Sequence, residues 1–388
     1  MAEPKDFIPF HRAIIGDDDI AEVVDTLRSG WITTGPKVAA FEQAFARTVG
    51  APHAVAVNSC TAAMHLAVAA LDLGPGDEVI TTPYTFVATS EVILYIGARP
   101  VFVDVRPEDA NIDPDLIEAA ITPRTRGIMP VHVAGFPVRM DRVMEIARAH
   151  GLWVVEDAAH AIETAWKGVR AGRWGTAGAY SFYATKNITS AEGGMLACDD
   201  EALADRVRHL SLHGMSRDAW KRYTATGSWY YEVTARGYKY NLTDVAAALG
   251  LSQLRKIDAW HALRQRYAAT YAAAFAGHPA LVPPAVPADA VVAWHLYPLR
   301  LRLDALGIGR AEFIERLRLR GIGTSVHFIP LHLHPYYRES FGCRPGQFPR
   351  AEAFYEAEIS LPLYPGLAPE EVERVAAAVV GIADEAMQ

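Results

Sequence analysis

Cysteine and surplus cationic charge are both scarce in this 388-residue chain. Its three cysteines, Cys60, Cys198 and Cys343, have spacings that match no metal-binding or redox motif, so we expect free thiols and a cytoplasmic location. Lysine and arginine number 37 against 45 acidic residues, giving a net charge of -8. A general nucleic-acid binder needs clustered cations to displace counterions from phosphates, so the charge argues against that class.

Long apolar runs and the common nucleotide-binding loops are missing as well. The uncharged stretch from 51 to 71 is interrupted by Asn58, Ser59, Thr61 and His65, which makes it a poor membrane span. The first residues carry charges and no apolar run, so no secretory signal is expected. Neither a GxxxxGK[ST] loop nor a GxGxxG turn occurs, which argues against ATPase and dehydrogenase classes.

Short apolar runs alternate with helical periodicity over the first half of the chain. The runs predict strands at 53–57, 78–82, 100–105, 126–132 and 152–157. Helical spacing after Pro114 and before Gly151 predicts helices between them. Strand and helix in alternation predict an α/β fold with a mostly parallel sheet covered on both faces. Ligands of such sheets bind at the carboxyl ends of the strands, where Asp157 is expected.

The second half is less regular. Helices are expected over 202–212, through 249–257, over 311–320 and after Pro369. We expect a large domain over residues 1–248 and a smaller α+β domain over residues 249–388.

Lys186 lies in the segment SFYATKNITSAEGGM, some thirty residues after EDAAHA. A lysine amine can form an imine with an aldehyde, and Asp157 after an apolar strand can hold a ring nitrogen protonated. Pyridoxal phosphate (PLP) chemistry requires both. Lys186 could instead be a solvated lysine, and Asp157 a helix cap. The strand-like residues Ser181 to Tyr183 and the acidic Glu156 favour buried roles for both.

A phosphate site is expected where the chain turns from strand into helix at NSCTAAMHLA. The first turn of a helix offers unpaired N–H groups and a positive dipole end, so Ser59, Thr61 and Ala62 could bind phosphate. Two aromatic side chains have open interpretations. His160 is either structural or functional, and Phe86 is either core or stacked on a planar cofactor.

Three histidines lie close together in the segment HFIPLHLH, a pattern that can bind a metal ion, but the details argue against a metal site here. His332 and His334 share one face of an extended chain, whereas His327 points the other way and no carboxylate lies in the segment. No metal is therefore expected.

Several long motifs together carry a family resemblance. EDAAHA, SFYATKNITSAEGGM, GYKYNLTD, SGWITTGPK, ITPRTRGIMPVHVAG and AWHL resemble the sugar-nucleotide aminotransferases of the DegT/StrS group, PLP enzymes of fold type I. The resemblance runs from Phe10 to about Pro365. WITTGPK, KNIT-x-AEGG and GYKYNLTD are most similar to the members that make UDP-4-amino-4-deoxyarabinose.

The resemblance implies roles around the cofactor. Lys186 would form the imine with PLP and then carry the proton, and Asp157 would pair with the pyridine nitrogen. His160 would lie against the ring or its phenolic oxygen, and Phe86 would stack on the ring. Thr61, Ala62 and Ser181 would hold the phosphate, next to Ser59 at the same helix start. A lysine at position 186, in place of the histidine of related sugar dehydratases, separates amine transfer from deoxygenation.

The resemblance also implies a homodimer with shared active sites. Lys239 and Asn241 would reach the partner's cofactor phosphate. Many members carry asparagine and arginine at these two positions, so which of the two touches phosphate stays open.

The expected reaction transfers an amino group from an amino acid, by resemblance L-glutamate, to a keto group of a UDP-linked sugar. The expected sugar-nucleotide pocket includes Trp31, Thr33, Trp229, Tyr231 and His327. Two alternatives remain open. One is another PLP enzyme, such as a cysteine desulfurase with Cys343 as its thiol. The other is a regulatory protein that binds PLP without catalysis.

Overall fold

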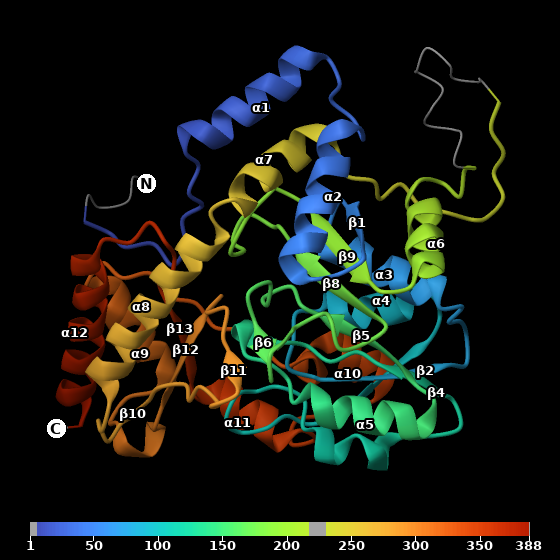
Figure 1. The fold of residues 1–388 in the computed structure, drawn as a ribbon. Coiled ribbons are helices and arrows are strands. Elements are labelled where there is room, and N and C mark those ends of the chain that lie inside the picture. Colours follow the sequence, from blue (N-terminus) through green and yellow to red (C-terminus); the bar gives the residue numbers. More distant parts are fainter. Residues whose placement is uncertain (1–5, 217–229, 388) are drawn as a thin grey trace.

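A seven-stranded sheet is the centre of the computed structural model, which describes residues 6–216 and 230–387 (Figure 1). Its strand order is β1-β9-β8-β5-β4-β2-β3. The strands are β1 (His53–Val57), β2 (Glu78–Thr81), β3 (Arg99–Phe102), β4 (Thr125–Ile128), β5 (Trp153–Asp157), β8 (Ala177–Ser181) and β9 (Gly194–Cys198). Neighbours pair in parallel from β3 to β8, whereas β9 runs antiparallel to β8 and β1. The mostly parallel sheet is thus confirmed.

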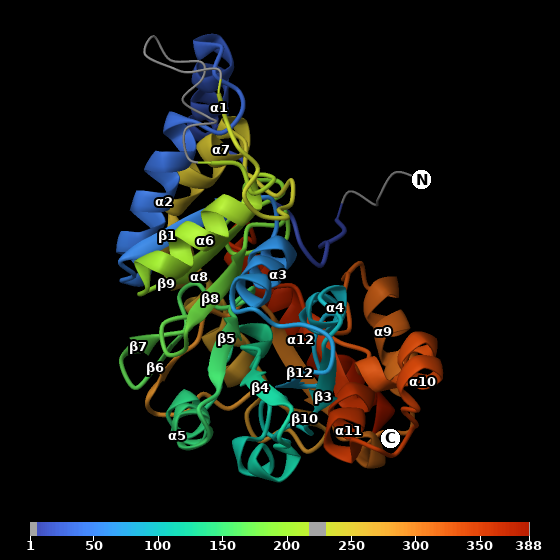
Figure 2. The same cartoon turned by 90° about the vertical axis from the view of Figure 1, so that its right-hand side faces the viewer.

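Helices cover both faces of this sheet. The helices α3 (Cys60–Ala70), α4 (Ala88–Tyr95) and α6 (Glu201–Ser211) pack on one face, and α2 (Pro36–Val49), α5 (Met140–His150) and α7 (Asp244–Leu254) pack on the other (Figure 2). Successive strand residues point to opposite faces, so Val154 and Val155 of β5 enter different apolar clusters. Burial on both sides explains why these strands are continuous apolar runs.

The five predicted strands are all present, within a few residues at their ends. The prediction of an α-helix after Pro114 is wrong. The chain forms two short 3-10 turns there, η1 (Pro114–Leu116) and η2 (Glu118–Ala120). Pro114 and Ile117 are buried, while Leu116 is exposed, so the segment lacks the continuous apolar face that would favour an α-helix.

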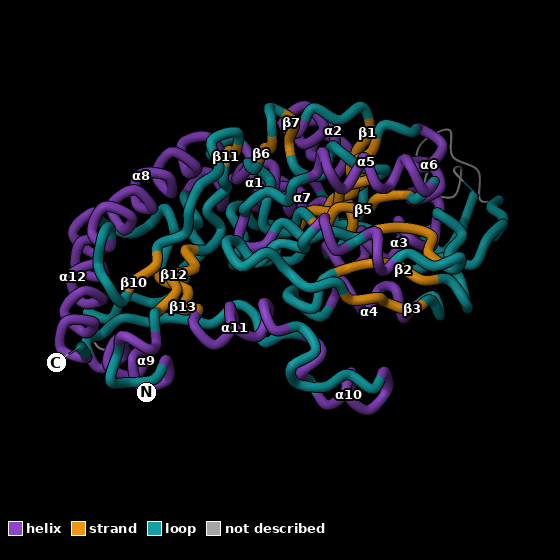
Figure 3. The backbone as a smooth tube through the Cα atoms, turned by 90° about the horizontal axis from the view of Figure 1, so that it is seen from below, coloured by secondary structure: helices purple, strands orange, loops and turns teal. Residues whose placement is uncertain are grey.

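The second half of the chain forms an antiparallel sheet of β10 (Leu281–Val282), β12 (Tyr297–Leu301) and β13 (Glu358–Leu361). Helices α8 (Ile257–Phe275), α9 (Arg310–Leu319) and α12 (Pro369–Ala386) pack around it, with α8 beside α12 (Figure 3). The remaining elements are α1 (Asp17–Ser29), α10 (Pro335–Phe341), α11 (Pro349–Ala357), η3 (Val133–Gly135), η5 (Leu303–Ala305), η6 (Leu331–Leu333), and a small sheet of β6 (Ala165–Trp166), β7 (Val169–Arg170) and β11 (Ala290–Val291).

The expected single helix through 249–257 is two helices, α7 and α8, separated at Arg255 and Lys256. The predicted domain boundary after residue 248 falls inside α7, which packs on α1 and α2 of the large domain. We therefore propose that the smaller domain begins with α8. All three cysteines are free. In the described part of the chain, no helix has the length and apolar character needed to cross a bilayer.

Gly194 allows β9 to lie against the start of α3. A Cβ atom at this position would sit 2.3 Å from the carbonyl carbon of Ser59, where any side chain would push the two segments apart. The turn that precedes α3 is thereby held at the edge of the sheet.

Candidate active site

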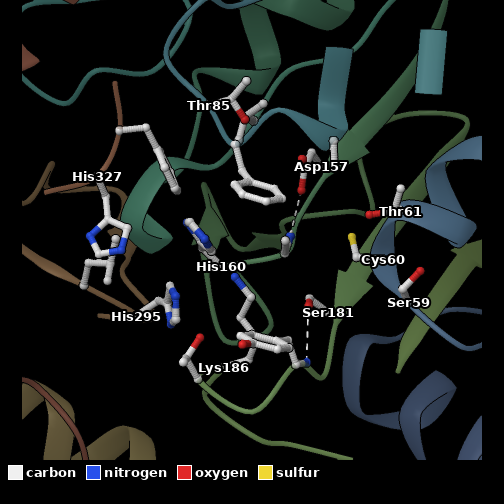
Figure 4. Close-up of a pocket in the computed structure, with 18 of the residues that line it drawn as sticks. Ser59, Cys60, Thr61, Thr85, Asp157, His160, Ser181, Lys186, His295 and His327 are labelled. Carbon is white, nitrogen blue, oxygen red and sulfur yellow. Dashed lines mark hydrogen bonds between the residues drawn. The ribbon is translucent and has the colours of Figure 1, made fainter. Parts of the chain in front are cut away.

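A cavity of about 530 Å³ lies at the carboxyl ends of the parallel strands, between the large sheet and residues of the smaller domain. It brings together the start of α3, the end of β5 and the loop after β8, with His295 and His327 from the second half of the chain (Figure 4). This is the edge at which the sequence predicts a ligand.

Lys186 lies in the loop between β8 and β9, and its side chain reaches the cavity. Burial lowers the pKa of its ammonium group to about 8, because removal from water disfavours the charged form. Asp157, together with Cys60, acts in the opposite direction but does not cancel this effect. The amine is therefore closer to its nucleophilic form than an ordinary lysine is.

Asp157 is the last residue of β5 and is 5% exposed. Thr89 Oγ1 donates a hydrogen bond to its Oδ2 at 2.7 Å, and the N–H of Ala159 donates to its Oδ1 at 3.1 Å. No lysine, arginine or histidine of the described residues forms an ion pair with it. Burial raises its pKa above the ordinary value. Since no helix begins at Ala158, the helix-cap interpretation does not hold.

The turn before α3 offers donors to the same cavity. Ser59 caps the helix by accepting a hydrogen bond from the N–H of Ala62 at 3.0 Å. Ser59 and Thr61 line the cavity, together with Ser181 across from them, whereas Ala62 is buried behind the turn. A helix N-terminus with two hydroxyl groups suits a phosphate.

His160 faces the cavity as a neutral hydrogen-bond donor. Its Nδ1 accepts from the N–H of Ala134 at 3.2 Å, so the ring proton lies on Nε2. Burial lowers its pKa well below the ordinary value, with a smaller contribution from the Lys186 charge. The ring stacks with Phe328 at 5.9 Å between centroids.

Phe86 is not a core residue. It is 60% exposed and lines the cavity, which leaves its ring face available to a planar ligand.

His295 lies beside His160, with 4.3 Å between the ring centroids, and was not singled out by sequence reasoning. The amide nitrogen of Asn187 donates to Glu163 at 2.8 Å and to the carbonyl of Ala293 at 3.0 Å. Its oxygen must therefore accept from His295 Nδ1 at 3.2 Å, which leaves the Nε2 of His295 as an acceptor. The AWHL motif was the available signal for this residue.

Besides Ala62, five of the predicted residues that the structure describes do not line this cavity within one chain. Lys239 contacts the amide oxygen of Asn241, whose Nδ2 donates to Thr34 at 2.7 Å. Trp31 and Thr33 lie in the segment between α1 and α2, and Tyr231 is exposed. Trp229 falls outside the described residues. The roles assigned to all of these stay predictions.

The three histidines of the HFIPLHLH segment have separate surroundings. His327 lines the cavity, whereas His332 is buried with its Nε2 2.8 Å from Glu352. The described residues contain no group of three or more metal-ligating side chains.

Solved structures with this fold define the class of the protein. Spr1654 from Streptococcus pneumoniae, solved in its PLP form, is 35% identical with a TM-score of 0.91, over 98% of this chain and 100% of that chain. The Helicobacter pylori aminotransferase PseC, involved in pseudoaminic acid biosynthesis, is 31% identical with a TM-score of 0.91, over 98% and 100%. The protein is a PLP-dependent aminotransferase with the expected fold.

The family follows from the sequence match. The model of the DegT/DnrJ/EryC1/StrS aminotransferase family matches residues 13–380, and the chain belongs to this family. The spore coat polysaccharide biosynthesis protein SpsC of Bacillus subtilis is 51% identical over 374 residues, covering 96% of each chain. The predicted family and cofactor are thus confirmed.

We predict that covalent coupling of pyridoxal to Lys186 in the cofactor-free protein accelerates with pH and levels off above about pH 8, because the neutral amine then predominates. The measurement is the rate of growth of visible absorbance after mixing, with Lys186→Ala as the control that lacks the signal. A rate that continues to rise toward the ordinary lysine pKa of about 10.4 contradicts the lowered value.

Proposed function

We propose that the protein transfers an amino group from L-glutamate to the keto group of a nucleotide-linked sugar, with a UDP-linked 4-keto sugar as the favoured substrate. The observation that carries the chemistry is one cavity with a partly neutral Lys186 amine and a buried Asp157 carboxylate that forms no ion pair among the described residues. The sugar assignment is supported by the WITTGPK, KNIT and GYKYNLTD motifs. The names of two relatives also support it, since SpsC is named for spore coat polysaccharide biosynthesis and PseC for pseudoaminic acid biosynthesis.

The cavity fits PLP on several independent observations. Asp157 is a buried carboxylate with no cationic partner in the described part of the chain, Lys186 supplies an amine, and the start of α3 supplies phosphate donors. When bound, PLP supplies an aldehyde for the amine and a cationic ring that accepts an electron pair. Each of these needs therefore has a matching residue in the chain.

Lys186 has two tasks in this proposal. Its amine would hold the cofactor aldehyde, and its free Nζ would remove the α proton of the amino acid and return it to the reacting carbon. A pKa of about 8 suits both directions of this transfer near neutral pH. Asp157 would keep the ring nitrogen protonated, and the Nε2–H of His160 would be available to the phenolic oxygen.

We predict that enzyme converted to its pyridoxamine phosphate form by L-glutamate regains the PLP absorbance when a UDP-4-keto sugar is added. The rate should be on the order of 100-fold higher than with the same sugar lacking its nucleotide, because binding energy far from the reacting carbon raises the rate. Matched 3-keto sugar nucleotides are the controls. Absorbance that returns only with simple keto acids, and with no sugar nucleotide, contradicts the proposed substrate.

We further propose a homodimer in which Lys239 or Asn241 completes the partner's phosphate site. Of the described residues that line the cavity, Lys186 is the only lysine or arginine, so the chain's own walls provide little cationic charge for a phosphate dianion. Lys239 is exposed and lies outside its own cavity. A cation from a second copy of the chain would offset the negative charge of the phosphate.

Mixed dimers test this sharing. Lys186→Ala and Lys239→Ala chains each give weakly active homodimers, but a heterodimer of the two contains one complete site. We predict that random mixing restores about a quarter of wild-type activity, since half of the dimers are mixed and each has one working site. Mixing Lys186→Ala with Asp157→Ala is the control without recovery, because both residues belong to the same chain's cavity. Equal results from the two mixtures contradict the shared site.

The alternatives have less support. Cys343 does not line the cavity, and the thiol that does, Cys60, has its pKa raised well above the ordinary value by burial. Neither suits a desulfurase nucleophile. A regulatory protein without catalysis has no need for the lowered pKa of Lys186. The cytoplasmic location stays part of this proposal.

A further inference from the structure

A buried carboxylate in the smaller domain is joined to the cavity through two side chains. Glu358 and Ser360 alternate along β13 and therefore point to the same face of the strand. Ser360 Oγ contacts Glu358 Oε1 and lies 2.9 Å from Nδ1 of His327. The N–H of His327 donates to the other carboxylate oxygen, Oε2, at 3.0 Å. Glu358 and Ser360 are fully buried, whereas the ring of His327 lines the cavity.

These contacts allow two proton arrangements with the same atoms in place. When Glu358 is ionised, Ser360 donates to it and accepts from the Nδ1–H of His327, which leaves Nε2 as a bare acceptor. When Glu358 is protonated, it donates to Ser360, Ser360 donates to Nδ1, and the imidazole proton lies on Nε2. The imidazole is neutral in both arrangements, which differ by one proton.

The groups around Glu358 allow its carboxyl group to be either ionised or protonated. No ion pair with Glu358 occurs among the described residues. The guanidinium of Arg310 contacts the backbone carbonyl of Glu358 at 3.5 Å and lies 4.4 Å from the ring centroid of Tyr355, and its charge only partly opposes the effect of burial on the carboxyl pKa. The hydroxyl of Tyr84 donates to the carbonyl of His327 at 2.6 Å, and burial keeps its pKa far above neutral. Burial raises the pKa of Glu358 to about 8.

The surroundings of the His327 ring on the cavity side disfavour its positively charged form. Burial lowers its pKa to about 4, and the Lys186 ammonium contributes in the same direction. His160 and His295 also face it and are themselves neutral, with pKa values well below ordinary because of burial. A proton that enters at Nε2 is therefore best passed on through the ring.

We propose that Glu358, Ser360 and His327 form a proton relay that serves the sugar half-reaction. The inference rests on the proposed function, in which the keto oxygen leaves as water when its carbon gains nitrogen. Nε2–H of His327 gives its proton to that oxygen, Nδ1 takes the Ser360 proton, and Ser360 takes the proton of Glu358. Glu358 is left ionised and is reprotonated along the same chain. His327 is the catalytic residue, and Ser360 and Glu358 are positioning residues.

The direct test is the protonation pattern of His327 in the PLP-loaded protein with ¹⁵N-labelled histidine, read by NMR and assigned with His327→Gln. The relay predicts Nε2–H below about pH 8 and Nδ1–H above it, following the pKa of Glu358. In Glu358→Gln the amide imitates the protonated acid, so Nε2–H should persist at every pH. Ser360→Ala should abolish the change, and Ser360→Thr, which keeps the hydroxyl, should retain it.

Glu352→Gln is the matched control, because it alters another carboxylate that contacts a histidine, His332, away from the cavity. It should leave the pattern of His327 unchanged. In rapid kinetics, Ser360→Ala should slow the sugar half-reaction about 100-fold, a typical loss for general acid catalysis, while the glutamate half-reaction changes about threefold at most.

A single tautomer of His327 throughout the titration of the wild-type protein overturns the relay, as does a pH-dependent change that survives in Ser360→Ala. Should no keto sugar react with the wild type, the proposed substrate fails, and the NMR titration still decides the relay on its own. The two failures are thus distinguishable.

Discussion

The carboxylate of Asp157 lies buried at the end of β5 with two hydrogen bonds and without an ion pair among the described residues. Burying an ionised carboxylate is costly, and the hydroxyl of Thr89 and the N–H of Ala159 offset only part of that cost. Its pKa is raised as a result. A cationic ring nitrogen beside it would stabilise the charged form, so the binding of the cofactor and the electron-accepting state of its ring arise from the same interaction.

The other residues of the cavity are placed to serve cofactor binding and the proton transfer beside it. The parallel sheet brings Asp157 to its carboxyl edge, and Gly194 allows the turn before α3 to lie beside it. Lys186 reaches the same space from the loop after β8, where burial makes its amine less basic. The smaller domain contributes neutral histidines whose hydrogen bonds fix which nitrogen faces the ligand. The buried charged groups of the cavity are thus the lysine and the aspartate, with the exposed Glu192 also at its wall, and the neutral polar groups act through oriented dipoles.

Much of this was predictable from the sequence, because the signals are local. Apolar runs identify the strands, and the position of Asp157 directly after one of them identifies the ligand edge. The lysine motif identifies the amine. Contacts between distant residues were not predictable. Thr89 is 68 residues from Asp157, and Asn187 is 108 residues from His295, so only the folded chain brings these pairs together. Trp31, Thr33, Lys239 and Asn241 do not line the cavity of their own chain, and their roles stay predictions.

The protonation state of the cofactor's ring nitrogen tests the central claim most directly. Protein loaded with PLP that carries ¹⁵N in its ring can be examined by NMR, with Asp157→Asn as the comparison. The account predicts a protonated ring nitrogen in the wild type and an unprotonated one in Asp157→Asn. An unprotonated nitrogen in the wild type, or the same protonation state in both proteins, would contradict it.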